Sequence, residues 1–358
     1  MPTLGSRIPT NIRKAVRLAR RFIDQRSSGS SLDLGALERN QIHEILRDIA
    51  EDLGFATEEI CNILFIRNSR GKTFRAHGLW MPLDDFATGA ICGDKELCRQ
   101  ILSKENVSLP RGKTFSSLEL DSALAFARSL NTHCVTKPAR GTSSGRGVSV
   151  GLVGDVAVRR GFRRAALYGQ DILIEEFVSG ENFRFLVYQG KCLSVVHRRI
   201  ATAVGDGVKS VLELVAVMNR GRINSEHWRI GDPTALPVPL GAGLRSALAP
   251  QGLSPKSVPA AGQMVRLATH ANYQFGATYT EVMDIAHPVL VTAAETAARS
   301  VGVRFAGVDV IAKDVSVNEY WINEINTTPS PELHHMVSNS EKAREPLRTV
   351  LLDILGSE

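Results

Sequence analysis

The sequence predicts a mixed α/β or α+β fold with more than one domain or subdomain. With 358 residues, the chain is long enough for a large core and for more than one such part. Its 43% hydrophobic and 22% charged residues are ordinary values for a globular protein. Helix-like and strand-like segments alternate over most of its length, which disfavours a helical bundle or a β-sandwich.

The first ninety residues are expected to form a smaller N-terminal domain. A basic amphipathic helix over about 11–23 is either a transit peptide or an ordinary solvated helix. The apolar spacing over 36–55 fits one buried helical stripe that ends at Gly54, and a short strand is expected over 62–68.

Residues 91–358 are expected to form the second domain, in which helix and strand alternate. Strands are expected over 132–138, 147–152, 171–178, 183–200, 305–314 and 320–326, and helices over about 118–130, 210–219, 287–301 and 346–355. The segment 223–259 is rich in Pro, Gly and Ser, so it is expected to be mostly loop with a short helix.

Charge and cysteine content limit the classes of ligand and compartment. The net charge of +6 favours an anionic ligand, which leaves nucleotide, acidic metabolite and nucleic acid open. No basic patch interleaved with aromatic residues supports nucleic acid. The five cysteines are scattered without C-x-x-C spacing, which suits a reducing compartment and predicts a cytoplasmic protein. No apolar run approaches the roughly 18 residues of a membrane span, so no membrane is expected as a partner.

The glycine-rich segment "GTSSG", Gly141 to Gly145, is compatible with two chemistries. It matches the nucleophile elbow of a hydrolase, in which Ser143 would be the nucleophile. An elbow requires a helix after the turn, whereas "RGVSVGL" has the alternation of a strand. A strand, a glycine loop and a second strand form a hairpin, which disfavours the hydrolase.

The alternative is a loop that covers phosphates. Lys137 lies at the end of the preceding strand, at the root of this loop. Backbone amides in the loop are candidate donors to phosphate oxygens: Gly141, Thr142, Ser143, Ser144, Gly145 and Gly147. A flexible hairpin tip beside an incidental lysine remains open on these residues alone.

A candidate metal site lies near the C-terminus. Asp309 interrupts the apolar strand "AGVDVIA", where an unpaired carboxylate would be costly. Glu324 and Asn326 are two residues apart in "INEIN", so a strand directs both to one face with Ile325 opposite. Oxygen ligands on neighbouring strands suit Mg²⁺ that also binds nucleotide phosphates. The alternative is that these acids pair with buried arginine or cap a turn.

The segment "ILIEEFVSGENFRFLV" is a candidate site for a nucleoside. Backbone groups at Glu176 and Val178 are placed to contact a base edge, and Glu181 and Asn182 follow a turn from which they could reach a ribose.

Taken in order, these motifs resemble the ATP-grasp superfamily, and within it the ligase modules of cyanophycin synthetase and bifunctional glutathione synthetase. The resemblance covers roughly residues 74–331. It rests on "DKELCRQIL", "VTKPARGTSSGRGV", "ILIEEFVSGENFRFLV", "HRRIATAVGDGVKSVLELVAVMNR", "GVDVI" and "INEINTTP". It implies an ATP-grasp fold in which two α+β subdomains grip ATP, a lid over about 93–176 and a metal- and substrate-binding subdomain over about 177–358.

The resemblance also implies roles for individual residues. Lys95 and Lys137 would contact ATP phosphates, and Arg184 and Arg198 would lie near the phosphate and acyl groups. The hinge against adenine would be formed by Glu175, Glu176, Phe177 and Val178, and Mg²⁺, with Mn²⁺ as an alternative, would be held by Asp309, Glu324 and Asn326.

Two departures from the family pattern concern ribose and substrate. Relatives usually have an acid where this chain has Asn182, so either Glu181 substitutes or the ribose contact is weaker. The segment "NYQFGATYTE" differs from the family at the substrate side. Candidate substrate residues are Asn272, Gly276 and Glu281 in this segment, together with Arg199 and with His334, which follows the metal motif.

The expected function is an ATP-dependent carboxylate-amine ligase that forms an amide or peptide bond through an acyl phosphate. Its expected partners are small carboxylate and amine substrates, amino acids or small peptides, and a homodimer is left open. The main alternative is a catalytically silent nucleotide-binding module. A serine hydrolase that uses Ser143 is a remote alternative.

Overall fold

The computed structural model describes residues 34–142, 145–224, 236–272, 275–337, 339 and 342–356. The chain groups into two compact units, a smaller one (Met1–Leu37 and Arg198–Tyr279) and a larger one (Glu38–His197 and Thr280–Glu358). Each is described separately. The predicted Ser143, Ser144 and basic helix over 11–23 lie outside the described residues.

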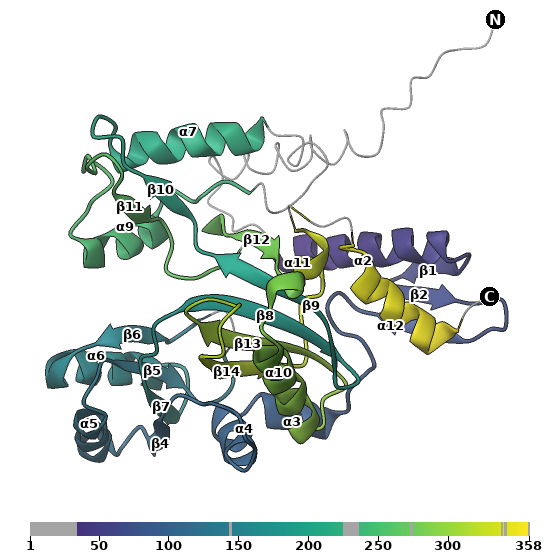
Figure 1. Ribbon diagram of the computed structural model, residues 1–358, viewed down its shortest axis with the longest axis horizontal. Helices are drawn as coiled ribbons and strands as arrows, with labels where there is room; N and C mark the ends of the chain where they lie inside the picture. Colours follow the sequence, from purple (N-terminus) through teal and green to yellow (C-terminus); the bar gives the residue numbers. More distant parts are fainter. Residues whose placement is uncertain are drawn as a thin grey trace, which may run out of the picture. The chain divides into compact units, whose positions relative to one another are not determined.

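A five-stranded sheet, in the order β12-β9-β8-β13-β14, lies mostly in the larger unit; the ends of β9 (198–199) and β12 (278–279) are grouped with the smaller unit. The strands are β8 (Glu181–Tyr188), β9 (Lys191–Arg199), β12 (Thr278–Glu281), β13 (Phe305–Ala312) and β14 (Tyr320–Asn326). Strand β13 pairs antiparallel with both β8 and β14. Figure 1 shows helix α10 (Pro288–Ser300) against this sheet, where its alanines and Leu290 join one hydrophobic core with Phe183, Val308 and Ile325.

An extra residue interrupts the regular pairing of β13 and β14. Asp309 lies opposite Glu324 and Val310 lies opposite Ile322, which leaves Asn323 as the inserted residue of a β-bulge.

A second sheet of the larger unit has the order β4-β7-β5-β6, with every printed pair antiparallel. The strands are β4 (Gly112–Ser116), β5 (Cys134–Pro138), β6 (Ser149–Leu152) and β7 (Asp171–Glu176). Helices α5 (Leu120–Ser129) and α6 (Gly154–Ala166) share a core with it (Figure 1). Strand β6 follows the glycine loop and pairs with β5, as the hairpin prediction requires.

The first part of the segment before the second sheet packs against the far C-terminus. It comprises α2 (Leu34–Asp52), β1 (Ala56–Ile60), β2 (Ile63–Arg67), β3 (Thr73–Ala76), α3 (Phe86–Cys92) and α4 (Lys95–Leu102). Side chains from α2 to β3 share one core with β8, β13 and α12 (Glu345–Leu355). The larger unit therefore has residues on both sides of position 90. The predicted boundary between an N-terminal domain (1–90) and a second domain (91–358) stays a prediction.

The smaller unit contains a two-stranded antiparallel sheet and two helices. Strands β10 (Thr202–Val204) and β11 (Met264–Arg266) pair antiparallel, and a core joins them to α7 (Val211–Ile223) and α9 (Ala242–Leu248). Ser210 caps α7 through a capping box with Glu213, which explains where this helix begins. Of the segment 223–259, which is expected to be mostly loop with a short helix, residues 225–235 lie outside the described part; residues 236–259 contain the short helix α9 within loop.

The remaining short helices are η2 (Ala249–Gln251), η4 (Met283–Ile285) and α11 (Glu332–His335). Among the residues described, no helix combines the length and the apolar character needed to cross a bilayer.

Candidate active site

Two lysines from different elements of the larger unit face acidic residues across one small cavity. Lys95 is the first residue of α4, and its ammonium lies 3.1 Å from Glu324 Oε1 of β14. Lys137 of β5 lies 2.5 Å from Glu175 Oε1 of β7 and donates to Asn323 Oδ1 at 3.3 Å. The cavity is lined by Cys92, Lys95, Cys98, Arg99, Leu102, Leu109, Lys137, Leu173, Glu175, Ile322, Asn323, Glu324 and Ile325.

Local structure fixes the position of Lys95. The Asp94 side chain caps α4 by accepting hydrogen bonds from the Glu96 and Leu97 amides, and Arg140 holds the same carboxylate at 2.7 Å. The Lys95 amide donates to the Ala139 carbonyl oxygen at 3.0 Å. A cation in the first turn adds to the positive end of the helix dipole, so this position favours an anionic ligand.

Lys137 is held by an ion pair away from solvent. Its exposed fraction is 6% and that of Glu175 is 5%, and Arg99 lies 3.9 Å from the same carboxylate. Burying two charges costs desolvation free energy that their attraction need not repay. The Lys137–Glu175 pair is therefore weak evidence for a contribution to the stability of the fold.

Asp309 forms a two-point pair with Arg184 across β13 and β8. Arg184 Nε donates to Asp309 Oδ1 at 2.6 Å and Nη2 donates to Oδ2 at 3.2 Å, while Nη1 donates to the Pro329 carbonyl oxygen at 2.8 Å. Burial alone would lower the pKa of Arg184, but the net shift is upward because Asp309, Glu324 and Glu332 surround it. The alternative that Asp309 pairs with a buried arginine is therefore realised.

Gly307 permits this arrangement. A Cβ atom at Gly307 would lie 2.5 Å from Arg184 Nη1 and 2.9 Å from its Cδ. The guanidinium thus crosses the sheet directly over the glycine.

The predicted metal ligands share one face of the sheet. Asp309 is paired in register with Glu324, Asn326 is paired with Gly307, and Ile325 is buried in the core opposite. The Asn326 amide nitrogen donates to the Gly307 carbonyl oxygen at 3.3 Å, which leaves its oxygen as the candidate ligand atom. Within the described ranges no three His, Cys, Asp or Glu side chains gather as a metal centre, so this set supplies two carboxylates and one amide. Their role as metal ligands stays a prediction.

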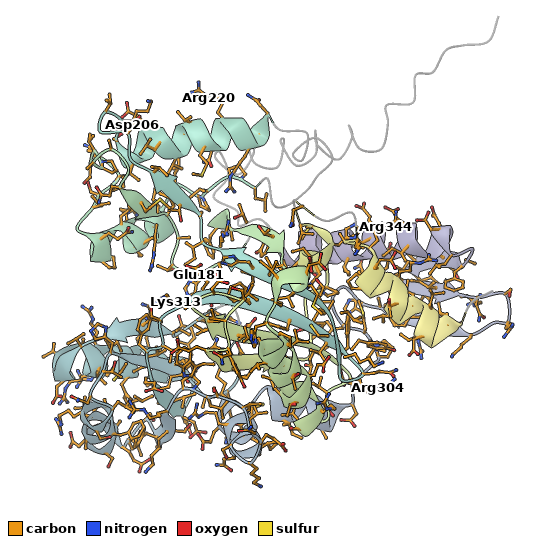
Figure 2. All side chains as sticks on the ribbon, viewed as in Figure 1. Glu181, Asp206, Arg220, Arg304, Lys313 and Arg344 are labelled. Carbon is orange, nitrogen blue, oxygen red and sulfur yellow. The ribbon has the colours of Figure 1, made fainter. Side chains whose placement is uncertain are left out.

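The predicted nucleoside residues fall on two faces. Glu181 pairs with His197 at 3.1 Å, and the His197 ring stacks on Phe183, which belongs to the α10 core. Alternation along β8 places Asn182 on the opposite face, with Arg184. Figure 2 shows Glu181 beside Lys313, which follows β13, while Arg304 marks the other end of that strand. Asn182, rather than Glu181, is the residue of the two that shares a face with Asp309.

The hinge residues have hydrogen bonds that restrict how they could contact a base. The Glu176 amide donates to the Arg111 carbonyl oxygen and the Phe177 amide to the His133 carbonyl oxygen, both at 2.8 Å. A base contact at Glu176 would therefore fall to its carbonyl oxygen.

In the glycine loop, Gly141, Gly145 and Gly147 have φ values of 69°, 74° and 77°, which favour glycine. Thr142 lies between the first two and is half-buried.

The predicted substrate residues are dispersed. Arg198, Arg199, Asn272 and Gly276 belong to the smaller unit. In the larger unit, His334 is 1% exposed and its Nδ1 lies 2.8 Å from Ser194 Oγ, and the Glu281 amide donates to Asn339 Oδ1 at 2.8 Å. Their roles stay predictions.

Sequence reasoning missed Asn323, Arg99 and the two cavity cysteines. Asn323 lies within a segment whose letters fit a regular strand, so the bulge left no clear signal. Arg99 follows Lys95 by one helical turn, and that spacing was the available signal.

Comparison with known proteins relates the chain to ligases of two kinds. It is 28% identical over 284 residues to the glutathione biosynthesis bifunctional protein GshAB of Clostridium perfringens, covering 75% of this chain and 35% of that protein. It is 27% identical over 267 residues to the cyanophycin synthetase of a Nostoc species, covering 73% of this chain and 29% of that protein. The chain thus spans about a third of the length of these relatives. No protein-family model matches it.

Among solved structures, the bifunctional glutathione synthetase from Pasteurella multocida superposes with a TM-score of 0.59 at 23% sequence identity. The match covers 86% of this chain and 43% of that chain, and it establishes the fold. The chain is therefore a protein of the ATP-grasp fold, related in sequence to bifunctional glutathione synthetase and cyanophycin synthetase.

Proposed function

We propose that this protein is an ATP-dependent ligase that joins a carboxylate to an amine through an acyl phosphate and releases ADP and phosphate. The observation that carries the proposal is the convergence of Lys95, Lys137, Glu324 and Asn323 on one cavity, beside the Arg184–Asp309 pair. The likeness to glutathione-forming and cyanophycin-forming proteins supports amino acids or small peptides as substrates. We further propose a cytoplasmic protein, which suits its scattered cysteines, and leave a homodimer as a second proposal to test.

The lysines supply positive charge for the phosphates of ATP. Each is now neutralised by a carboxylate, Lys95 by Glu324 and Lys137 by Glu175. An incoming phosphate chain would compete for the same ammonium groups, and charge-assisted hydrogen bonds to phosphate are strong. Lys95 is additionally placed where the positive end of α4 favours an anion.

The donor set fits magnesium. Mg²⁺ is usually held by one or two carboxylates together with phosphate oxygens and water, and Asp309, Glu324 and Asn326 supply two carboxylates and an amide oxygen on one face. When bound with ATP, Mg²⁺ would offset the charge of the phosphate oxygens, and we propose that Mn²⁺ can replace it. Arg184 is then a positioning residue, because both its hydrogen bonds to Asp309 fix the orientation of that carboxylate.

In the proposed reaction a substrate carboxylate oxygen attacks the γ-phosphorus and ADP leaves. The amine then attacks the acyl carbon, loses a proton, and phosphate leaves as the amide forms. Lys137 would neutralise charge on the transferring group. The loop over 141–147 would exclude water from the acyl phosphate, which water would otherwise hydrolyse. Arg198 is proposed for the oxyanion on the acyl carbon.

The test is a screen of amino acids and dipeptides with Mg-ATP, followed by ADP release and by mass spectrometry of the product. Lys137→Ala and Asp309→Asn should abolish substrate-dependent ADP release. Lys191→Ala, which changes an exposed lysine on β9, is the matched control and should turn over normally. Near-normal turnover in both Lys137→Ala and Asp309→Asn would contradict the proposed ligase site.

Two outcomes would favour the alternatives. Tight Mg-ATP binding without turnover across the screen would support a silent nucleotide-binding module. The ligase predicts that Ser143→Ala slows the enzyme but leaves activity, whereas complete loss together with a trapped acyl-serine on the unmodified protein would favour a hydrolase.

A further inference from the structure

Two cysteines lie together at the turn that carries Lys95. Cys92 ends α3 and Cys98 lies in the first turns of α4, and only Gly93 and Asp94 separate the two helices. Both side chains line the cavity that holds Lys95, Lys137 and Glu324. Their exposed fractions are 7% and 8%, so both cysteines are largely buried.

The two thiols lie at one small cavity, at the junction of α3 and α4. Interaction with Cys98 is the largest cause that raises the pKa of the Cys92 thiol, followed by burial. Cys98 Sγ also donates to the Ile91 carbonyl oxygen at 3.3 Å, which keeps this sulfur beside the end of α3. The spacing C-x5-C does not indicate this pair, because it is the turn between α3 and α4 that brings both cysteines to one cavity.

Cys98 and Lys95 are coupled through α4. They are three residues apart on one helix, so their side chains are neighbours on its surface. A displacement of the first turn of α4 toward α3 therefore moves Lys95 relative to Glu324, which lies on a separate strand.

We propose that Cys92 and Cys98 form a redox modification site that is oxidised to a disulfide by a peroxide, and that the disulfide weakens nucleotide binding by displacing Lys95. The first thiol is oxidised by hydrogen peroxide to a sulfenic acid, with release of one water. The second thiol attacks the sulfenic sulfur, the S–S bond forms, and a second water leaves. Two thiols and one peroxide thus yield one disulfide and two waters.

The displacement follows from bond geometry. The two sulfur atoms must approach to about 2.05 Å when the disulfide forms. Closing that gap draws the start of α4 toward the end of α3. A charged hydrogen bond lost at Lys95 would lower the affinity for ATP about tenfold or more. This consequence rests on the proposed nucleotide site, whereas the disulfide does not.

The first measurement maps the disulfide. Trypsin cleaves after Lys95, between the two cysteines, and after Arg75 and Arg99, so Cys92 and Cys98 fall in separate peptides spanning 76–95 and 96–99. In protein treated with hydrogen peroxide, non-reducing mass spectrometry should find these peptides linked, and dithiothreitol should separate them. Failure to find the linked pair at peroxide doses that oxidise the exposed Cys61 would overturn the proposal.

The second measurement is Mg-ATP affinity before peroxide, after peroxide, and after dithiothreitol. The unmodified chain should lose about tenfold in affinity and recover it on reduction. Cys92→Ser should show no peroxide-dependent change relative to its own affinity before peroxide, while the matched control Cys61→Ser should lose affinity after peroxide as the unmodified chain does.

Two further results are decisive. A linked peptide pair with unchanged ATP affinity, or equal sensitivity of Cys92→Ser and the unmodified chain, would contradict the coupling to Lys95. If the reduced protein binds no Mg-ATP, the proposed function fails, and the linked peptides still decide whether the disulfide forms.

Discussion

Arg184 and Asp309 are joined by two hydrogen bonds, of 2.6 and 3.2 Å, between adjacent strands in the interior of the larger unit. Both residues are 6% exposed. Removal of one partner leaves a buried charge without compensation, and such losses cost about 3–5 kcal/mol. We expect Arg184→Met to lower the free energy of unfolding by about that amount, as measured by urea denaturation.

The double variant Arg184→Met/Asp309→Leu is the control for this pair. Because it leaves no buried charge, it should recover part of the loss. A double variant that is less stable than Arg184→Met would mean that the pair is not the source of the effect.

Substitution at Gly307 should disturb the Arg184–Asp309 pair, because the new side chain would clash with Arg184. The new Cβ of Gly307→Ala would lie 2.5 Å from Arg184 Nη1, so either the guanidinium or the strand must move. We expect a loss of about 1–3 kcal/mol in stability and a fall in turnover. Gly89→Ala is the control, because Gly89 lies in helix α3 with open space around it and alanine should be neutral or slightly stabilising there. Equal effects of the two substitutions would contradict this account.

Gly147 should be more sensitive to substitution than Gly141. Gly141 and Gly147 both have left-handed φ, but a Cβ at Gly147 would also lie 2.8 Å from Pro138 Cγ and 2.9 Å from Tyr168 Cδ2, while one at Gly141 meets nothing. Alanine at Gly141 therefore reports the backbone cost alone, about 1 kcal/mol. Gly147→Ala should be more destabilising and should raise the KM for ATP further than Gly141→Ala. Thermal unfolding and steady-state kinetics of the two variants test this prediction. If Gly147→Ala and Gly141→Ala have the same Tm and the same KM for ATP, Gly147 has no packing role.

The Glu281 side chain should make stability depend on pH. Burial raises the pKa of Glu281 above its ordinary value of 4.5, despite hydrogen bonds from the Met283 and Val195 backbones. The folded protein then binds this proton more tightly than the unfolded chain does. Its stabilising contribution is present below the unfolded pKa and is lost as pH rises through the higher folded pKa.

Glu281→Gln should therefore raise the Tm at pH values above the folded pKa of Glu281, where the unmodified chain holds a charged carboxylate in a half-buried position. The gain should shrink as the pH falls toward 4.5, since the unmodified carboxyl is then protonated as well. Glu58→Gln, on the exposed strand β1, should show no such trend. A gain that persists unchanged in acid would argue against burial as the cause.

Local patterns predicted many elements and failed where distant residues decide the structure. Helices α5 and α10 begin and end within two residues of the expected ranges, because apolar spacing and caps are local signals. The expected long strand over 183–200 is instead two strands, β8 and β9, that turn at Gln189 and Gly190, both with positive φ. Helix α6 was not expected, since its valine-rich start continues the strand-like pattern of β6.

The candidate site shows the same division. An acid in an apolar strand indicated that Asp309 has a partner, but Arg184 is 125 residues away, and no local rule selects it. Alternation correctly placed Glu324 and Asn326 on one face of the strand. It could not show which of Glu181 and Asn182 faces Asp309, because that depends on the pairing of Glu181 with His197. The grouping of 198–279 as a separate unit likewise depends on contacts between segments far apart in the chain.

The inserted Asn323 divides β14 into two stretches of opposite phase. Strict alternation would put Tyr320 and Ile322 on the same side as Glu324, yet Tyr320, Ile322 and Ile325 all join the α10 core. Deleting Asn323 should therefore leave Glu324 and Asn326 facing as they do now, and remove only the amide that contacts Lys137. Deleting any single residue from 324 to 326 would instead break the spacing of the oxygen ligands. This strand should thus accept a change of length at one position and reject it at its neighbours.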